Sequence, residues 1–150
     1  MENLWGEIST EKIETPKSIL ETQAKYLSDA TNKKVYAEIE RDYINENAEK
    51  DDNLRFNFII RGKYMDNYGY QLLKIATPVD LYPVKIYLDQ KTLDEITVKL
   101  GDNNFIPFLQ YVTADNEKEY IDILRLVLSS KRVKNLITGI LSMSSKEQYF

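Results

Sequence analysis

The sequence predicts a single α+β domain: an antiparallel sheet of four to five strands with an N-terminal helix and two C-terminal helices packed on one face. Three observations carry this prediction. Apolar residues near the start of the chain follow a helical spacing, those in the middle alternate every second residue, and helical spacing returns in the last third. Because the connections in the middle are short, the strands are expected to form a meander.

The N-terminal helix is expected from about Pro16 to Thr31. Thr15 offers a hydroxyl at the N-cap position, and a proline at the first helical position has no N–H to leave unsatisfied. The preceding residues, 1–14, show no clear period. They are interpreted as a loosely packed arm of the same domain, residues 1–150, with Leu4, Trp5 and Ile8 as its anchors.

Four segments alternate as half-buried strands do. The first runs through Val35 and Ile39, and a polar stretch from 45 to 53 predicts a loop after it. The second runs from Leu54 to Arg61. The turn residues 66–69 then lead into a third strand over 70–77, and Val84, Ile86 and Leu88 mark the inward side of a fourth. The sequence therefore predicts strands over these four segments.

Residues 89–115 give the least definite pattern. Ile96, Val98 and Leu100 alternate with polar residues, as in a strand, and residues 101–104 have turn chemistry. Residues 105–113 are compatible with a further strand, which Pro107 would confine to a sheet edge or a bulge.

Two helices are expected at the C-terminal end. Asn116 and Glu119 have the spacing of a capping box, and Ile121, Leu124 and Leu128 form the buried stripe that follows. The stripe loses its phase at Ser129-Ser130, which predicts a break between two helices. The expected core comprises Ile19, Leu20, Leu27, Ile39, Phe56, Phe58, Ile60, Leu73, Ile75, Val84, Ile86, Leu124, Leu128, Val133, Leu136 and Ile140.

Both ends of the chain resemble a known group of sequences. The segment from Thr15-Pro16 through Ile19-Leu20, the Tyr82-Pro83 step and the apolar pattern of residues 123–141 carry the likeness. They resemble small uncharacterised bacterial and mobile-element proteins that pair a TPxxIL-type opening helix with a central sheet. The resemblance implies the order helix, sheet, helices, and it implies no catalytic residue.

Composition excludes several kinds of chemistry. The chain has no histidine and no cysteine, so imidazole bases, thiolate nucleophiles, disulfides and the usual zinc ligands are absent. A formal net charge of −4 makes nucleic acid an unlikely partner. No apolar run is long enough to cross a bilayer, and the cytoplasm is the expected compartment. No cofactor, no bound metal and no catalytic residue is predicted, and a non-enzymatic role is favoured.

Tyrosine is the most conspicuous residue type, with 11 in the chain. Tyr36 and Tyr87 alternate out of phase with the core, so they should lie on the sheet face opposite the helices. Tyrosine offers broad contact area with a polar tip, which suits protein interfaces. Its preference for strands explains the same pattern without a binding role, and both interpretations stay open. The expected binding residues are Tyr36, Ile59, Tyr64, Tyr68, Tyr70 and Tyr87.

The favoured function is binding of a protein partner, or of a second copy of the chain, through the uncovered sheet face or the 64–70 hairpin. The first alternative is a small-ligand domain with a pocket between sheet and helices. The second is a Mg²⁺-dependent enzyme, which would bring together carboxylates from the set Asp89, Asp94, Glu95 and Asp102.

A possible anion contact is predicted at the start of the last helix, where bases follow a helix N-terminus. Its residues are Lys131, Arg132 and Lys134.

Overall fold

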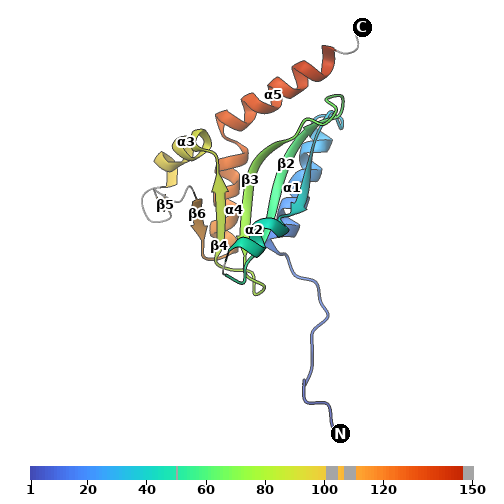
Figure 1. The fold of residues 1–150 in the computed structure, drawn as a ribbon, viewed down its shortest axis with the longest axis vertical. Coiled ribbons are helices and arrows are strands. Elements are labelled where there is room, and N and C mark those ends of the chain that lie inside the picture. Colours follow the sequence, from blue (N-terminus) through green and yellow to red (C-terminus); the bar gives the residue numbers. More distant parts are fainter. Residues whose placement is uncertain (50, 101–104, 107–110, 147–150) are drawn as a thin grey trace.

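The computed structural model describes residues 1–49, 51–100, 105–106 and 111–146. Helices and strands follow in the order α1, β1, α2, β2, β3, β4, α3, β5, β6, α4, α5 (Figure 1). Their bounds are α1 Pro16–Ala30, β1 Val35–Arg41, α2 Tyr43–Ala48, β2 Leu54–Gly62, β3 Tyr70–Thr77, β4 Val84–Leu88, α3 Gln90–Leu100, β5 Phe105–Ile106, β6 Tyr111–Ala114, α4 Glu117–Leu128 and α5 Lys131–Lys146.

All strands of the described residues join one antiparallel sheet in the order β1-β2-β3-β4-β6-β5. The first four strands form the expected meander, and β6 adds to β4 after α3. The register shifts between Phe58 and Ile59, because Leu72 on β3 is an extra residue without a partner there. The α+β class and the order helix, sheet, two helices are confirmed.

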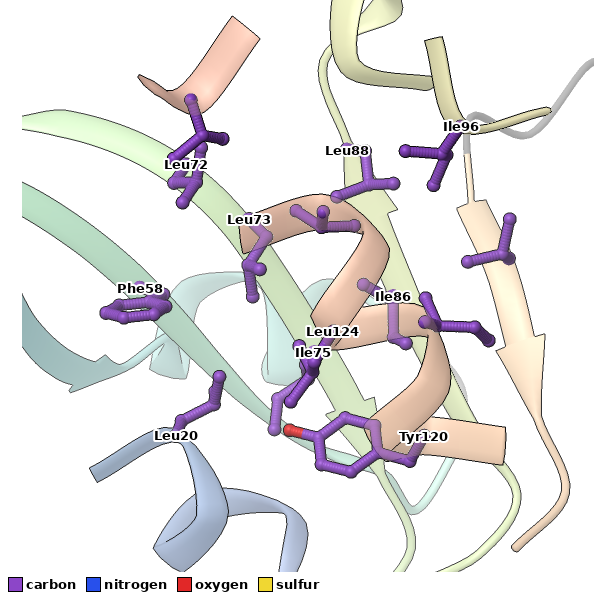
Figure 2. Packing of buried hydrophobic residues seen from close by; sticks show 14 of the residues in the cluster. Leu20, Phe58, Leu72, Leu73, Ile75, Ile86, Leu88, Ile96, Tyr120 and Leu124 are labelled. Atoms are coloured by element: carbon purple, nitrogen blue, oxygen red, sulfur yellow. The ribbon is translucent and has the colours of Figure 1, made fainter. Parts of the chain in front are cut away.

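The core lies between the sheet and the helices α1 and α4. Figure 2 shows Phe58, Ile75 and Ile86 from the sheet directed toward Leu20 of α1 and Leu124 of α4. Every residue predicted for the core is buried, except Leu27, Ile39, Leu128 and Leu136, which pack partly buried against it. The two helices therefore cover one face of the sheet.

The predicted N-cap residues are confirmed at both helix starts. Thr15 and Ser18 form a reciprocal capping box in which each side chain bonds the backbone N–H of the other. The Asn116 side chain accepts a hydrogen bond of 2.9 Å from the backbone N–H of Glu119. The Glu119 carboxylate accepts from the backbone N–H of Asp115, at 3.3 Å, in place of the Asn116 N–H that a capping box would use. The break at Ser129-Ser130 is also present, since α4 ends at Leu128 and α5 begins at Lys131.

Two segments differ from the sequence prediction. The alternation of Ile96 and Val98 predicted a strand, but both lie on α3, where Ile96 is buried and Val98 is 88% exposed. A helix forms in place of the predicted strand because it buries Leu93 and Ile96, three residues apart, on one side. The predicted loop after β1 instead contains α2, whose N-cap is Asp42. Pro107 lies outside the described residues.

The first residues of the chain leave the domain as an extended segment (Figure 1). We call residues 1–13 the N-terminal arm. It contains no helix or strand, and the side chains expected to anchor it are largely in solvent. Their exposed fractions are 78% for Leu4, 81% for Trp5 and 67% for Ile8. None of the described helices is both long and apolar enough to span a bilayer.

Candidate functional site

The sheet face away from α1 and α4 is the candidate site, and we call it the open face. The strand register defines it. Tyr36 pairs with Arg61, Glu38 pairs with Ile59, and Asn57 pairs with Lys74, which pairs in turn with Tyr87. These positions alternate with the core residues of the same strands, so their side chains share the other face. Lys85 on β4 and Tyr111 on β6 complete it.

Aromatic rings and cations stack at one side of the open face. Tyr87 and Tyr111 are cross-strand partners whose ring centroids lie 5.1 Å apart. The Lys74 ammonium lies 5.5 Å from the Tyr87 ring centroid, and the Lys85 ammonium lies 5.3 Å from that of Tyr111. Cation–π contacts of this kind hold long side chains against the sheet. The surface is therefore ordered before any partner arrives.

Ion pairs order the side nearer β1. The Arg61 guanidinium lies 2.7 Å from the Glu38 carboxylate and 3.6 Å from that of Glu40. Gly69 makes this possible, because a Cβ atom there would lie 2.6 Å from Arg61 Nη1 and 3.0 Å from Ile59 Cγ2. A glycine at this position therefore leaves room for the side chains of Arg61 and Ile59.

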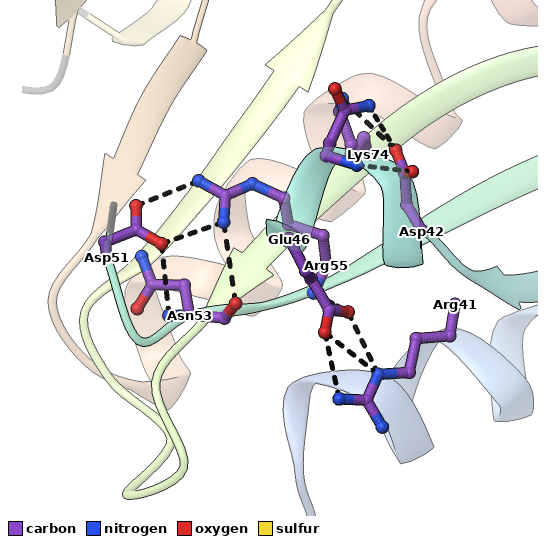
Figure 3. Close-up of polar contacts among 8 residues, drawn as sticks. Arg41, Asp42, Glu46, Asp51, Asn53, Arg55 and Lys74 are labelled. Atoms are coloured by element: carbon purple, nitrogen blue, oxygen red, sulfur yellow. Dashed lines mark hydrogen bonds and ion pairs between the residues drawn. The ribbon is translucent and has the colours of Figure 1, made fainter. Parts of the chain in front are cut away.

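One end of the open face is covered by α2 and the turn after it (Figures 1 and 3). Asp42, the N-cap of α2, lies 3.6 Å from the Lys74 ammonium. The Glu46 carboxylate accepts a hydrogen bond of 2.9 Å from the backbone N–H of Arg55 on β2. Arg55 is next to Phe56, the last residue of β2 that pairs with β1. Glu46 also receives the Arg41 guanidinium, which lowers its pKa.

Arg55 lies beneath this cover and is only 2% exposed. Its guanidinium donates two hydrogen bonds to the Asp51 carboxylate, at 2.8 and 2.9 Å. That bidentate contact lowers the pKa of Asp51 to about 2. Because the charge of Arg55 is matched at short range, it can stay buried at the edge of the site.

The structure brings together only part of the predicted binding set. Tyr36, Ile59 and Tyr87 share the open face, and all three are half-buried. Tyr64 lies in the β2–β3 turn with 40% of its surface exposed. Tyr68 packs against the core and, with Leu136 and Ile140 of α5, lines a hollow of about 250 Å³.

Tyr70 belongs to a different cluster, at the start of α5. Its hydroxyl donates to the Asp89 carboxylate and accepts a 2.9 Å hydrogen bond from Arg132, whose guanidinium also lies 3.7 Å from Asp89. Burial alone would raise the pKa of Asp89, but the hydrogen bonds from Tyr70 and Thr92 outweigh it and hold the pKa below its usual value. The cluster joins β3, the connection between β4 and α3, and α5.

The predicted anion contact at α5 is occupied by the chain's own carboxylate. Glu95 of α3 accepts hydrogen bonds from the backbone N–H groups of Lys131, at 2.7 Å, and Arg132, at 3.0 Å. These two bonds lower the pKa of Glu95. A carboxylate at a helix N-terminus satisfies donors that have no partner within the helix, so the arrangement joins α3 to α5.

Three of the carboxylates considered for catalysis, Asp89, Asp94 and Glu95, are each held by donors of the protein. Asp89 and Glu95 both contact Arg132, one at its side chain and one at its backbone, and Asp94 accepts from the Gln90 amide at 2.6 Å. Asp102 lies outside the described residues. Within the described part of the chain, no three acidic side chains are grouped so that they could hold a metal ion.

Sequence reasoning missed most of the open face. Arg55, Lys74, Lys85 and Tyr111 contribute to it, yet none was predicted as a site residue. Lys74 and Lys85 alternate with core residues on their strands, so the period-two pattern could have found them. The burial of Arg55 carries no sequence signal, because it depends on where α2 and the following turn lie.

Comparison with models of protein families, with curated protein sequences and with solved structures found no match to this chain.

Proposed function

We propose that this protein is a non-enzymatic interaction domain whose open face binds a protein partner. The observation that carries the proposal is the balance of charge around ordered aromatic side chains. Four bases, Arg55, Arg61, Lys74 and Lys85, lie on or beside this face with four acids, Glu38, Glu40, Asp42 and Asp51. A face without excess positive charge does not suit a phosphate backbone, whose binding depends on cations.

The open face also has the properties that protein partners use. Tyr36, Ile59 and Tyr87 supply contact area, and charged side chains held at the surface supply specificity. Because stacking and ion pairs already restrict these side chains, a partner orders fewer of them on binding. The cytoplasm remains the predicted compartment.

The test replaces tyrosines on the face and leaves a matched tyrosine elsewhere. Full-length protein is used to capture partners from the native host, and the captured protein is identified by mass spectrometry. Tyr36→Asp with Tyr87→Asp should abolish capture of that protein. Tyr26→Asp should retain it, because Tyr26 is 59% exposed on α1 and lies outside the open face. Circular dichroism checks that each variant is folded.

Retained capture by the folded double variant would refute the proposal. Loss of capture in the Tyr26→Asp variant as well would show that the contact does not depend on the open face. If the partner is a second copy of this chain, sedimentation shows a dimer that the double variant loses and Tyr26→Asp keeps.

The small-ligand and Mg²⁺-dependent alternatives remain predictions. A hollow of about 690 Å³ lies between α1 and α4, and no strand residue lines it. The ligand alternative had placed its pocket between sheet and helices. Asp89, just before α3, pairs with the Arg132 side chain, and Asp94 and Glu95 of α3 accept from Gln90 and from the backbone of Arg132, which does not favour Mg²⁺ there.

A further inference from the structure

We infer that the groove between α1 and α4 binds the N-terminal arm of a second copy of this chain, so that two molecules exchange arms. This inference concerns a surface other than the open face and does not depend on it. It rests on an apolar groove between α1 and α4 and on an arm whose apolar side chains lie in solvent.

The groove has a volume of about 690 Å³ and follows α1 and α4 side by side. Ile19 and Leu124 form its floor, since both are buried, while Ile121 and Leu128 stay partly exposed along its wall. Ile121, Leu124 and Leu128 belong to one stripe of α4. The described part of the molecule therefore buries only part of this apolar stripe and leaves Ile121 and Leu128 partly in solvent.

The arm carries apolar side chains that could pack against the apolar lining of the groove. Leu4, Trp5, Ile8 and Ile13 are between 67% and 81% exposed. Exposed apolar residues so close together in one short segment are a typical feature of an interaction site. Burying them in the groove would remove apolar surface of both the arm and α4 from water.

Charge favours the same pairing at one end of the groove. The arm has the acids Glu2, Glu7 and Glu11 against the single base Lys12. Arg125, which pairs with Asp122, and Lys134 line the groove toward the end of α4 and the start of α5, whereas Glu14 and Glu117 line it near the starts of α1 and α4. The arm's acids can therefore approach the end of the groove where Arg125 and Lys134 lie, which guides encounter more than it adds affinity.

The capping box indicates a second copy as the source of the arm. Thr15 and Ser18 bond each other's backbone N–H, and the Ser18 hydroxyl donates to the Glu14 carboxylate at 2.9 Å. Glu14 already lies at the groove. An arm returning to its own groove would have to reverse at these residues, whereas the observed cap directs it away from the domain (Figure 1).

The length of the arm is also sufficient. Thirteen extended residues span up to about 43 Å, whereas the 15 residues of α1 rise about 22 Å. The arm can therefore leave one domain and lie along the groove of another. Exchange in both directions gives a closed two-fold dimer in which each groove is filled.

Trp5, the single tryptophan, reports directly on this contact. Indole emission moves to shorter wavelength when the ring leaves water for an apolar site. We expect the full-length protein to become dimeric in sedimentation as its concentration rises from low micromolar to submillimolar, with a parallel shift of Trp5 emission. Leu4→Ser with Ile8→Ser should abolish both changes without affecting the fold, because these side chains are exposed.

A groove variant and a matched control complete the test. Ile121→Glu should also abolish dimer and shift, whereas Val98→Glu, at an exposed apolar position on α3, should change neither. Three results would overturn the inference: solvated Trp5 emission in a monomer at every concentration, a shifted emission independent of concentration in a monomer, or a dimer with shifted Trp5 emission that survives both the arm and the groove variants. Tyr36→Asp with Tyr87→Asp should keep the concentration-dependent shift of Trp5 emission, and Leu4→Ser with Ile8→Ser should keep any dimer formed through the open face, so the two contacts are distinguished.

Discussion

At the scale of single residues, buried polar atoms decide which contacts matter. Tyr120 is fully buried, and its hydroxyl donates a hydrogen bond of 2.8 Å to the carbonyl oxygen of Pro16, 104 positions away in the chain. Burial raises the pKa of this phenol well above its usual value, so it stays a donor at any pH the protein meets. The bond joins the start of α1 to α4 beneath the core.

Tyr120→Phe should therefore lower the free energy of unfolding by about 1 kcal/mol, the usual net contribution of a hydrogen bond. The ring stays and the packing is kept, so only the polar contact is lost. Urea denaturation measures the change. Tyr26→Phe, at an exposed position, serves as the control and should leave the midpoint unchanged. An equal loss in both variants would contradict the role given to the buried bond.

Two glycines should respond in opposite ways to alanine. Gly139 lies inside α5, and no atom lies within 4 Å of an added Cβ. Gly139→Ala should raise the free energy of unfolding by about 0.5–1 kcal/mol, because alanine reduces the entropy of the unfolded chain. Gly69→Ala should not stabilise, since its Cβ would displace Arg61. Thermal unfolding of the two variants compares them, and stabilisation by Gly69→Ala would contradict the close approach.

At the scale of elements, α3 and α5 depend on each other. Glu95 of α3 supplies the acceptor for two N–H groups of the first turn of α5. Glu95→Ala should expose those groups to solvent. We expect faster amide hydrogen exchange at Lys131 and Arg132 with little change in β2 and β3. Asp94→Ala is the control, since Asp94 bonds Gln90 within its own helix and makes no such contact with α5. Unchanged exchange at these two amides would contradict the capping role.

The same elements show what the sequence could predict. Helix starts with local caps, at Thr15 and Asn116, and strands with clear alternation were predictable because their causes lie within a few residues. α3 was not predicted, because Ile96, Val98 and Leu100 satisfy a strand period by chance. What determines α3 is the burial of Leu93 and Ile96 against distant parts of the chain.

The candidate site divides in the same way. Alternation placed Tyr36 and Tyr87 opposite the core, since a strand register needs only local information. The burial of Arg55 could not be predicted, because it depends on how α2 packs against the sheet. The position of Tyr70 could not be predicted either, because it contacts Asp89 and Arg132 only where α5 packs against the sheet. Contacts between residues far apart in the chain therefore set the limits of the site.

At the scale of the whole molecule, the absence of histidine and cysteine determines how stability should depend on pH. No side-chain type in this chain has an ordinary pKa between about 5 and 8. The shifted carboxylates that the structure shows, Asp51, Asp89 and Glu95 among them, all have pKa values below the usual range. None of these groups changes charge near neutrality.

The dependence of stability on pH follows from the direction of these shifts. A carboxyl group whose pKa is lower in the folded state binds fewer protons there than when unfolded, so it stabilises the fold above the unfolded pKa. That contribution is lost as the pH falls through the folded value. For Asp51 the window extends from its ordinary pKa of 3.8 down to about 2.

We therefore expect urea midpoints that are constant between about pH 6 and 8 and that fall steadily below about pH 4. Asp51→Asn should reduce the acid-induced fall in the free energy of unfolding by no more than about 1 kcal/mol. The effect is small because the Asp51 side chain is 36% exposed, so water partly screens its ion pair. Asp52→Asn is the neighbouring control and should keep the full acid dependence. A midpoint that changes sharply between pH 6 and 8 would contradict this expectation, because no side-chain type in the chain has an ordinary pKa in that range.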